Sequence, residues 1–221
     1  MLWPQRVLVA ALVVVPLAFV AEQAIQTLRI LPVIERERDT WQRPDDILRP
    51  FDPAAGKTIV DLGSGAGYFA LKMSPRVGPA GHILAIDLRR QSLAFLWMRA
   101  TLGGYRNLQV IRAEADNPHL PAEPVDGALI ANTYHELVFP EAVLRALFIA
   151  MRPGARLVVV DRGPRDGSES RAAAAAHHEL TAAAAEREIT QQGFQAITSD
   201  DRFIDVATVE DLWWLAVFQK P

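Results

Sequence analysis

The sequence predicts an α/β fold in which a doubly wound, mainly parallel sheet of seven strands carries helices on both faces. From Thr58 onward, short apolar runs rich in β-branched residues alternate with helical segments, a pattern typical of parallel sheets that are buried on both sides. A glycine-rich turn separates the first of these runs from its helix. Two consecutive strand-like segments end the chain, and they predict an antiparallel edge of the sheet.

Each predicted element follows from a local pattern of residues. The predicted strands are 58–62, 82–87, 108–112, 126–131, 156–161, 194–204 and 211–221. One helix follows the glycine turn and ends near Ser74, and the others are expected at 90–102, 140–151 and 169–192. Pro153 and Gly154 are expected to stop the third helix, and Gly193 the fourth.

Composition excludes several classes of function. The chain has 221 residues, of which 50% are hydrophobic, which suits one α/β domain with a short appendage. A formal net charge of −3 gives no basic surface of the kind that nucleic acid requires, so no nucleic-acid partner is expected. The absence of cysteine excludes disulfides, thiolate metal sites and cysteine nucleophiles.

The N-terminus contains an uncharged apolar run of 15 residues, 7–21, preceded by Arg6. A bilayer span needs about 20 residues, so three interpretations stay open: a cleaved secretory signal, an uncleaved membrane anchor, or a buried helix. The first two place the protein at a membrane or outside it, and the cytoplasmic face stays open as well. We therefore expect an apolar N-terminal helix and stalk at 1–34 and a catalytic domain at 35–221, with its motifs between 57 and 162.

The turn after the first strand carries glycines at 63, 65 and 67, and a strand ends at Asp87, 20 residues further on. Glycines let a ligand approach the backbone closely, and an acid at the end of the second strand binds the hydroxyls of a ribose. Asp61 beside the turn would repel a phosphate and attract an ammonium group. A nucleoside that carries an amino acid and no phosphate fits both features, which points to S-adenosylmethionine. An ordinary tight turn, and Asp87 as a helix cap, are the alternatives.

The segment Val60–Gly67 resembles the first motif of the class I S-adenosylmethionine-dependent methyltransferases, and the resemblance extends over roughly 38–221. Asp87 matches the acid that binds ribose in that family. Asp116 matches an acid near the adenine in its quinone-biosynthesis and small-molecule branch, although a turn-forming role is the alternative. The resemblance implies the strand order 3-2-1-4-5-7-6. The residues expected to bind the cofactor are Asp61, Gly63, Ser64, Gly65, Gly67, Asp87, Leu88, Asp116, Asn132 and Trp41.

The loop after the fourth strand, 132–137, faces the transferred methyl group in this architecture. It offers the phenol of Tyr134, the imidazole of His135 and the carboxylate of Glu136. His135 is the first candidate for a base or for a group that orients the substrate, with Glu136 and Tyr134 behind it. The alternatives are that His135 braces the loop and that Glu136 is solvated or ion-paired.

Two further segments bear on the site. Related small-molecule methyltransferases fold the segment before the first strand over the cofactor, so Trp41, Gln42 and Pro44 are expected to form a lid; a core position for Trp41 is the alternative. His177 and His178 are adjacent on an expected helix, where neighbouring side chains point about 100° apart. That spacing does not suit a metal, so no metal site is expected.

These patterns predict an S-adenosylmethionine-dependent methyltransferase that acts on a small or lipophilic molecule. One alternative is a methyltransferase-fold protein that binds ligands without turnover. Another is an NAD-dependent oxidoreductase, against which the spacing of the glycines and Asp61 both count.

Overall fold

The computed structural model describes residues 3–52, 54–164, 176–205 and 212–221, and leaves the side chains of 3–17 and 20 undescribed. The chain forms two units, Met1–Thr40 and Trp41–Pro221. The sequence placed this boundary after Ile34. The difference arises because the first helix continues through 34 without a break.

The first unit is helical, since α1 spans Trp3–Gln42. Within the described part of the chain, no helix combines the length and apolarity that crossing a bilayer requires. The apolarity predicted for the N-terminal helix concerns residues 7–21, and most of their side chains lie outside the described residues. Membrane association or export through this segment therefore stays a prediction.

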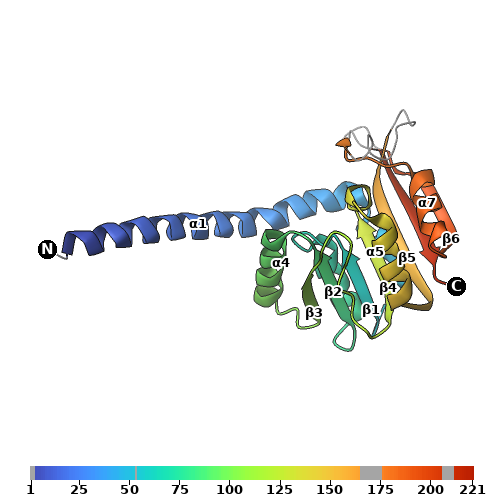
Figure 1. Ribbon diagram of the computed structural model, residues 1–221, viewed down its shortest axis with the longest axis horizontal. Coiled ribbons are helices and arrows are strands. Elements are labelled where there is room, and N and C mark those ends of the chain that lie inside the picture. Colours follow the sequence, from blue (N-terminus) through green and yellow to red (C-terminus); the bar gives the residue numbers. More distant parts are fainter. Residues whose placement is uncertain (1–2, 53, 165–175, 206–211) are drawn as a thin grey trace. The chain divides into compact units, whose positions relative to one another are not determined.

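The second unit is built on one seven-stranded sheet, whose strands are ordered β3-β2-β1-β4-β5-β7-β6 (Figure 1). Its strands are β1 (Thr58–Leu62), β2 (His82–Asp87), β3 (Leu108–Arg112), β4 (Val125–Ala131), β5 (Met151–Gly163), β6 (Gln195–Ile204) and β7 (Leu212–Gln219). The first five strands pair in parallel, and β7 pairs antiparallel with both β5 and β6. The predicted fold class and strand order are confirmed.

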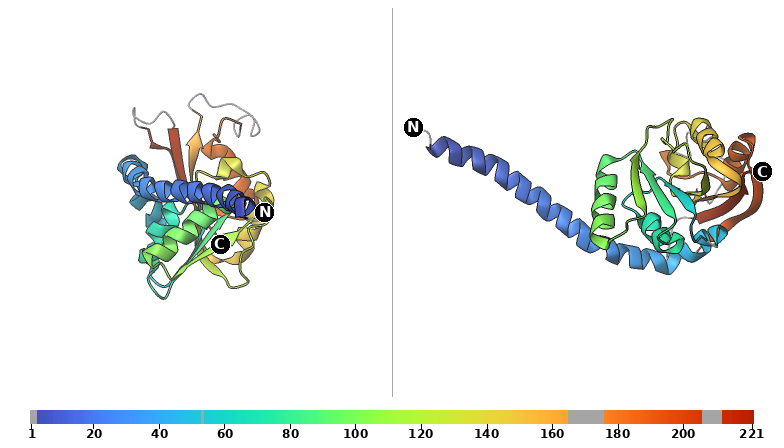
Figure 2. Two further views of the ribbon diagram at one scale, coloured as in Figure 1. Left: turned by 90° about the vertical axis from the view of Figure 1, so that its left-hand side faces the viewer. Right: turned by 90° about the horizontal axis from the view of Figure 1, so that it is seen from below.

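Helices cover both faces of this sheet (Figure 2). They are α2 (Pro44–Leu48), α3 (Tyr68–Val77), α4 (Arg90–Gly103), α5 (Pro140–Ala150) and α7 (Ala182–Gln191), with 3-10 turns η1 (Arg49–Phe51) and η2 (Tyr134–Glu136). Side chains of α5 and α7 share one buried cluster with alternate strand residues such as Val60 and Ile130. Side chains of α2, α3 and α4 share the other cluster with Ile59 and Leu129. This alternation arises because successive strand residues point to opposite faces.

Two predicted boundaries were wrong. The helix predicted over 140–151 ends at Ala150, but the strand predicted to begin at Arg156 already begins at Met151, because the backbone there pairs with β4. The helix expected over 169–192 is interrupted: among the described residues, Ala176 is helical, His177 and His178 form a turn, and α7 follows. Helix α7 begins after Thr181, whose hydroxyl accepts a hydrogen bond from the Ala184 N–H at 3.2 Å. Residues 169–175 of that prediction lie outside the described residues.

The segment between α1 and β1 packs into the core. Ile47, Leu48 and Phe51 are buried. A Cβ on Gly127 of β4 would lie only 2.8 Å from the ring of Phe51, which is too close for a real contact. Gly127 therefore opens the space that Phe51 fills. This packing fixes the chain that leads into β1 and its glycine turn.

The last strand contributes two buried indoles to opposite faces, as its alternation predicts. Trp214 donates its Nε1–H to the carbonyl oxygen of Leu180 at 2.6 Å, on the face that carries α7. Trp213 packs on the other face, where its ring centroid lies 5.8 Å from that of Trp41. Trp214 thus holds the chain just before α7 against the sheet.

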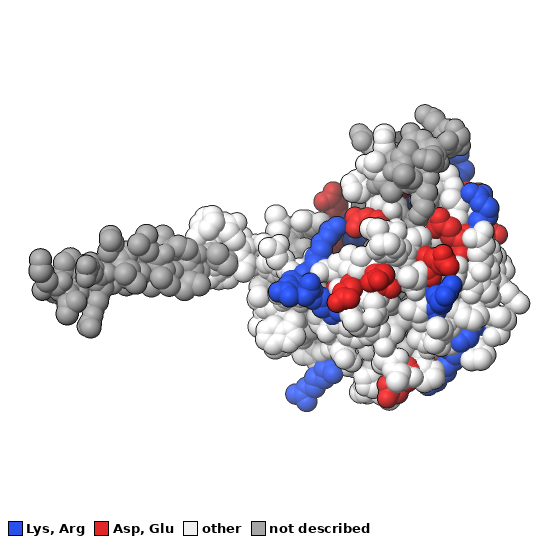
Figure 3. All heavy atoms as spheres, viewed as in Figure 1, with Lys and Arg blue, Asp and Glu red and all other residues white. Residues whose placement is uncertain are grey.

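Charged side chains of both signs lie next to one another on the face of the molecule seen in Figure 3. The ion pairs of the described residues include Arg89 with Glu136 and Arg145 with Glu141. Such exposed pairs contribute roughly 0–1 kcal/mol each to stability, so they do not hold the fold together.

The packing of α2 predicts a contrast between two isoleucines. Ile47 is 0% exposed and Ile149 of α5 is 73% exposed. Ile47→Ala should lower the free energy of unfolding by about 2–5 kcal/mol because it leaves a cavity. The matched control Ile149→Ala should change it by less than about 0.5 kcal/mol. Urea unfolding of the full chain measures both, and equal effects would mean that α2 is not part of the core.

Candidate active site

The glycine turn after β1 takes a backbone form that favours glycine at three positions. The φ angles of Gly63, Gly65 and Gly67 are 77°, 53° and 94°, in the left-handed region that costs other residues about 1–2 kcal/mol. A Cβ on Gly63 would lie 2.1 Å from Oγ1 of Thr133, and one on Gly67 would lie 2.2 Å from Leu96. A Cβ on Gly65 would meet nothing within 4 Å. Two of the glycines therefore permit close packing, and the third leaves open space beside its backbone.

The turn is anchored to the neighbouring strand by its own amides. The N–H groups of Gly63 and Ser64 both donate to the carbonyl oxygen of Ile86, at 2.8 and 3.0 Å. Ser64 is buried, and its Oγ has no hydrogen-bond partner among the described residues. A buried hydroxyl without a partner is costly, so the turn presents a polar atom that a ligand can satisfy.

Asp87 lies at the end of β2 and faces this turn, as predicted. Its Oδ2 accepts from the Gly65 N–H and its Oδ1 from the Arg89 N–H, both at 2.8 Å. A carboxylate has about four acceptor sites, so two remain for a ligand. The side chain of Leu88 follows it and is 52% exposed, which leaves an apolar surface beside the carboxylate.

The loop after β4 is held in an unusual backbone form. Asn132 has a φ of 52°, and its N–H donates to the carbonyl oxygen of Val160 at 2.8 Å. Its Oδ1 is buried and has no hydrogen-bond partner among the described residues. Thr133 then packs on Gly63. His178, whose ring lies beside that of His135, has a φ of 58°. Left-handed conformations of residues other than glycine cluster at functional sites, so Asn132 and His178 mark the loop as a candidate site.

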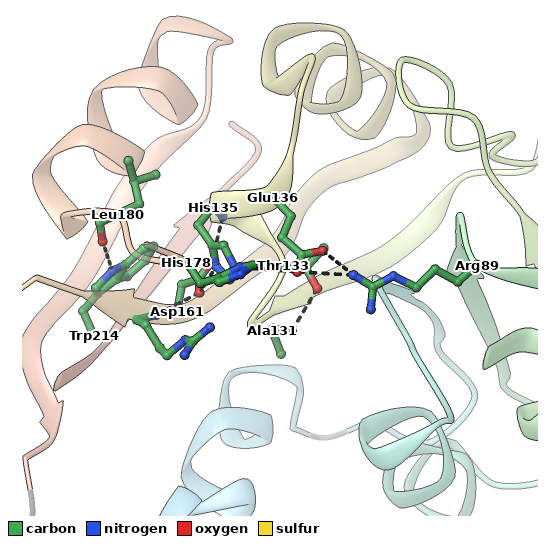
Figure 4. A network of polar contacts seen from close by, with 10 residues as sticks. Arg89, Ala131, Thr133, His135, Glu136, Asp161, His178, Leu180 and Trp214 are labelled. Atoms are coloured by element: carbon green, nitrogen blue, oxygen red, sulfur yellow. Dashed lines mark hydrogen bonds and ion pairs between the residues drawn. The ribbon is translucent and has the colours of Figure 1, made fainter. Parts of the chain in front are cut away.

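His135 is the most constrained side chain of the loop. It is 1% exposed, its Nδ1 lies 2.7 Å from Oδ1 of Asp161, and its backbone N–H donates to Oδ2 of the same carboxylate at 2.9 Å (Figure 4). A carboxylate accepts hydrogen bonds, so it holds the ring proton on Nδ1 and leaves the lone pair on Nε2. That Nε2 is buried and has no hydrogen-bond partner in the described part of the chain.

The two neighbours of His135 have different surroundings. Tyr134 is fully buried, and its hydroxyl donates to Oε2 of Glu188 in α7 at 2.9 Å. These contacts describe a residue that braces η2, and a catalytic role for Tyr134 stays a prediction. Glu136 is 40% exposed and accepts from Arg89 at 3.0 Å. That ion pair joins the end of β2 to the loop after β4.

The remaining predicted residues have mixed outcomes. Asp61 lies in β1 just before the turn and is 2% exposed. Asp116 is exposed in a turn after β3 that Glu114 and Asn117 close with mutual backbone hydrogen bonds, so its contact with the cofactor stays a prediction. Trp41 packs against Trp213, which is the core position considered for it. A lid role for Trp41, Gln42 and Pro44 stays a prediction.

Sequence reasoning missed three residues of the site: Arg89, Asp161 and His178. The sequence could have indicated Asp161, because it is an acid near the end of β5, the strand next to β4. Asp87 has the same kind of position at the end of β2. His178 was expected on a helix beside His177. Both residues instead lie in a turn, and the ring centroid of His178 lies 5.5 Å from that of His135. Only the fold reveals that proximity.

Comparison with known proteins gives the family. A family model described as a methyltransferase domain matches residues 53–208. The chain therefore belongs to this methyltransferase family. Its fold is that of the class I S-adenosylmethionine-dependent methyltransferases, with S-adenosylmethionine as the cofactor.

Two curated relatives align with the central part of the chain. The ubiquinone/menaquinone biosynthesis C-methyltransferase UbiE of Pasteurella multocida is 28% identical over 107 residues, which cover 48% of this chain and 40% of that protein. The protein-L-isoaspartate O-methyltransferase of Ignicoccus hospitalis is 28% identical over 109 residues, which cover 49% of each chain. The chain thus matches less than half the length of either relative.

Solved structures share the fold over most of the chain. An S-adenosylmethionine-dependent methyltransferase from Aquifex aeolicus has a TM-score of 0.67 at 23% identity, covering 80% of this chain and 89% of the other. The [4+2]-cyclase SpnF has a TM-score of 0.66 at 14% identity, covering 81% of each chain. At these identities the likeness shows the fold alone.

The hydrogen bonds of Asp161 predict one tautomer of His135. In the neutral imidazole, the proton should lie on Nδ1 in the wild-type protein. In Asp161→Asn, an amide that can donate should shift the population toward the Nε2–H form. Nitrogen-15 NMR of labelled histidine side chains distinguishes the two forms. Glu136→Gln serves as the control and should keep the wild-type pattern. A His135 spectrum that Asp161→Asn leaves unchanged would contradict the assignment.

Proposed function

We propose that this protein transfers the methyl group of S-adenosylmethionine to a small, lipophilic acceptor bound beside the loop after β4. The observation that carries the proposal is the position of His135. Its unpartnered Nε2 belongs to the loop whose Thr133 packs on Gly63 of the glycine turn. A group that can face an acceptor and a turn that can hold a nucleoside therefore share one edge of the sheet.

The residues at this edge fit the parts of the cofactor. The free acceptor sites of Asp87 suit the two hydroxyls of a ribose, and the exposed Leu88 suits the face of an adenine. The open space at Gly65, with the unpartnered Ser64 hydroxyl beside it, suits close approach of the amino-acid part. When bound, S-adenosylmethionine supplies a methyl group that its positively charged sulfur makes electrophilic.

In this proposal the protein aligns the acceptor and takes up its proton. The acceptor atom would form a bond to the methyl carbon as the bond from that carbon to sulfur breaks, which leaves S-adenosylhomocysteine. A proton on the acceptor atom would move to Nε2 of His135. Asp161 keeps the other ring nitrogen protonated, so the basic lone pair always faces the acceptor. Asp161 is thus a positioning residue. Burial of the imidazole also keeps water from the lone pair.

Two observations favour a small, lipophilic acceptor. The loop lacks the Asn/Asp-Pro-Pro-aromatic motif of amino-directed nucleic-acid methyltransferases, which favours a small molecule. Similarity to a quinone-biosynthesis C-methyltransferase favours a lipophilic one. The neighbour named as a cyclase is a reason to test the chemistry directly, since the fold alone does not fix it.

Cofactor binding provides the first test. The wild-type chain should bind S-adenosylmethionine and not NAD in equilibrium titrations. Asp87→Ala should weaken binding by about 1–3 kcal/mol, because it removes the acceptor for two hydroxyls. Asp201→Ala, an exposed acid of β6, should leave the affinity unchanged. Preference for NAD would refute the proposal, and an unaffected Asp87→Ala variant would refute the ribose assignment.

Turnover provides the second test. Wild-type protein with labelled S-adenosylmethionine and a panel of lipid-extract acceptors should transfer label. His135→Ala should lower kcat by about 10²–10⁴-fold, the range of a general base, while cofactor affinity stays within about twofold. His119→Ala, an exposed histidine after β3, is the matched control. Full turnover in His135→Ala would return this residue to a bracing role.

A further inference from the structure

Three side chains of two segments bring donor atoms together at the loop after β4. His135, Glu136 and His178 each offer one atom, and these atoms all lie within 4.8 Å of one another. Nε2 of His135 lies 3.8 Å from Oε1 of Glu136, and Nδ1 of His178 lies 4.0 Å from the same oxygen. Figure 4 shows both imidazoles beside the glutamate.

An independent observation points to a ligand at this place. The Nε2 of His135 is directed at the cluster and is buried without a hydrogen-bond partner among the described residues. The ring cannot turn this atom elsewhere without losing the contact of Nδ1 with Asp161. Leaving such a buried acceptor unsatisfied is energetically costly, and a bound group at Nε2 would remove that cost.

The surroundings of the cluster have the form of an outer coordination sphere. Imidazoles that bind metals almost always donate their other N–H to a carboxylate or carbonyl, as His135 does to Asp161. Glu136 is oriented in turn, because Arg89 donates to its Oε2 at 3.0 Å and to its Oε1 at 3.4 Å, and Oε1 also lies 3.8 Å from Nε2 of His135. The Arg89 pair is exposed and adds little stability, so its effect is to hold the carboxylate beside the imidazoles.

We propose that His135, Glu136 and His178 bind one divalent cation of the Zn²⁺ type. Two imidazole nitrogens and one carboxylate oxygen form the ligand set of open zinc sites, whereas Ca²⁺ and Mg²⁺ prefer oxygen ligands throughout. Bonds of about 2.0–2.2 Å require the donor atoms to approach by roughly 0.5–1.5 Å. The side chains of Glu136 and His178 are 40% and 60% exposed, so they are free to move that far.

The cation would occupy the lone pair that otherwise takes up a proton. A metal and a proton exclude each other at Nε2, so in the cation-bound protein an oxygen of the acceptor would fill the open position. The cation would then stabilise the acceptor anion as a Lewis acid, and the proton would leave to solvent. Binding of the cation does not itself rest on methyl transfer and can be measured without cofactor or acceptor.

Two adjacent histidines allow a matched test. The untagged full chain, stripped with a chelator, is titrated with Zn²⁺ against a chromophoric competitor, and Co²⁺ absorption reports the ligand geometry. The wild-type chain and His177→Ala should each bind one equivalent with affinities within about twofold. His178→Ala should bind at least about tenfold more weakly, and Asp161→Asn about 10–100-fold more weakly. Circular dichroism confirms that each variant is folded.

The possible outcomes are distinct. Equal Zn²⁺ affinity in wild type and His178→Ala would overturn the proposal, as would an equal loss in His177→Ala. Lack of methyl transfer in a protein whose Zn²⁺ affinity depends on His178 would support the metal site and count against the proposed function alone.

Discussion

The close approach of Gly63 to Thr133 is the constraint from which the site follows. The turn after β1 and the loop after β4 leave neighbouring strands at the same edge of the sheet, and Thr133 fills the space where a Cβ on Gly63 would stand. Any other residue at 63 would push these segments apart. Because they touch, the turn that carries Ser64 and the loop that carries His135 lie side by side.

Tyr134, His135 and Glu136 are consecutive, but each contacts a different element of the fold. Tyr134 reaches α7 through its hydroxyl, His135 reaches β5 through Asp161, and Glu136 reaches the end of β2 through Arg89. The 3-10 geometry of η2 sends the three side chains in three directions. Tyr134 supports the loop, His135 presents a lone pair, and Glu136 carries an exposed charge.

The sequence was sufficient for the sheet and for the proximity of Asp87 to the glycine turn. Glycines 63, 65 and 67 and the acid Asp87 lie in one stretch, so their spacing predicts their proximity. The surroundings of His135 depend on contacts between distant residues: Asp161 lies 26 residues from its partner His135, and no local pattern links them. His178 was predicted wrongly for a local reason. Alanines favour a helix, but Trp214 bonds the carbonyl oxygen of Leu180 and the helix starts only after Thr181.

The ion pair between Arg89 and Glu136 and the contact of Gly63 with Thr133 are the two described links between β1–β2 and the loop after β4 that bear on the site. The glycine turn and the loop after β4 are otherwise separate parts of the chain. If the proposed function holds, substitutions around β5 and α7 would alter the acceptor site and leave the cofactor site unchanged. A scaffold divided in this way is well suited to acquire new substrates one loop at a time.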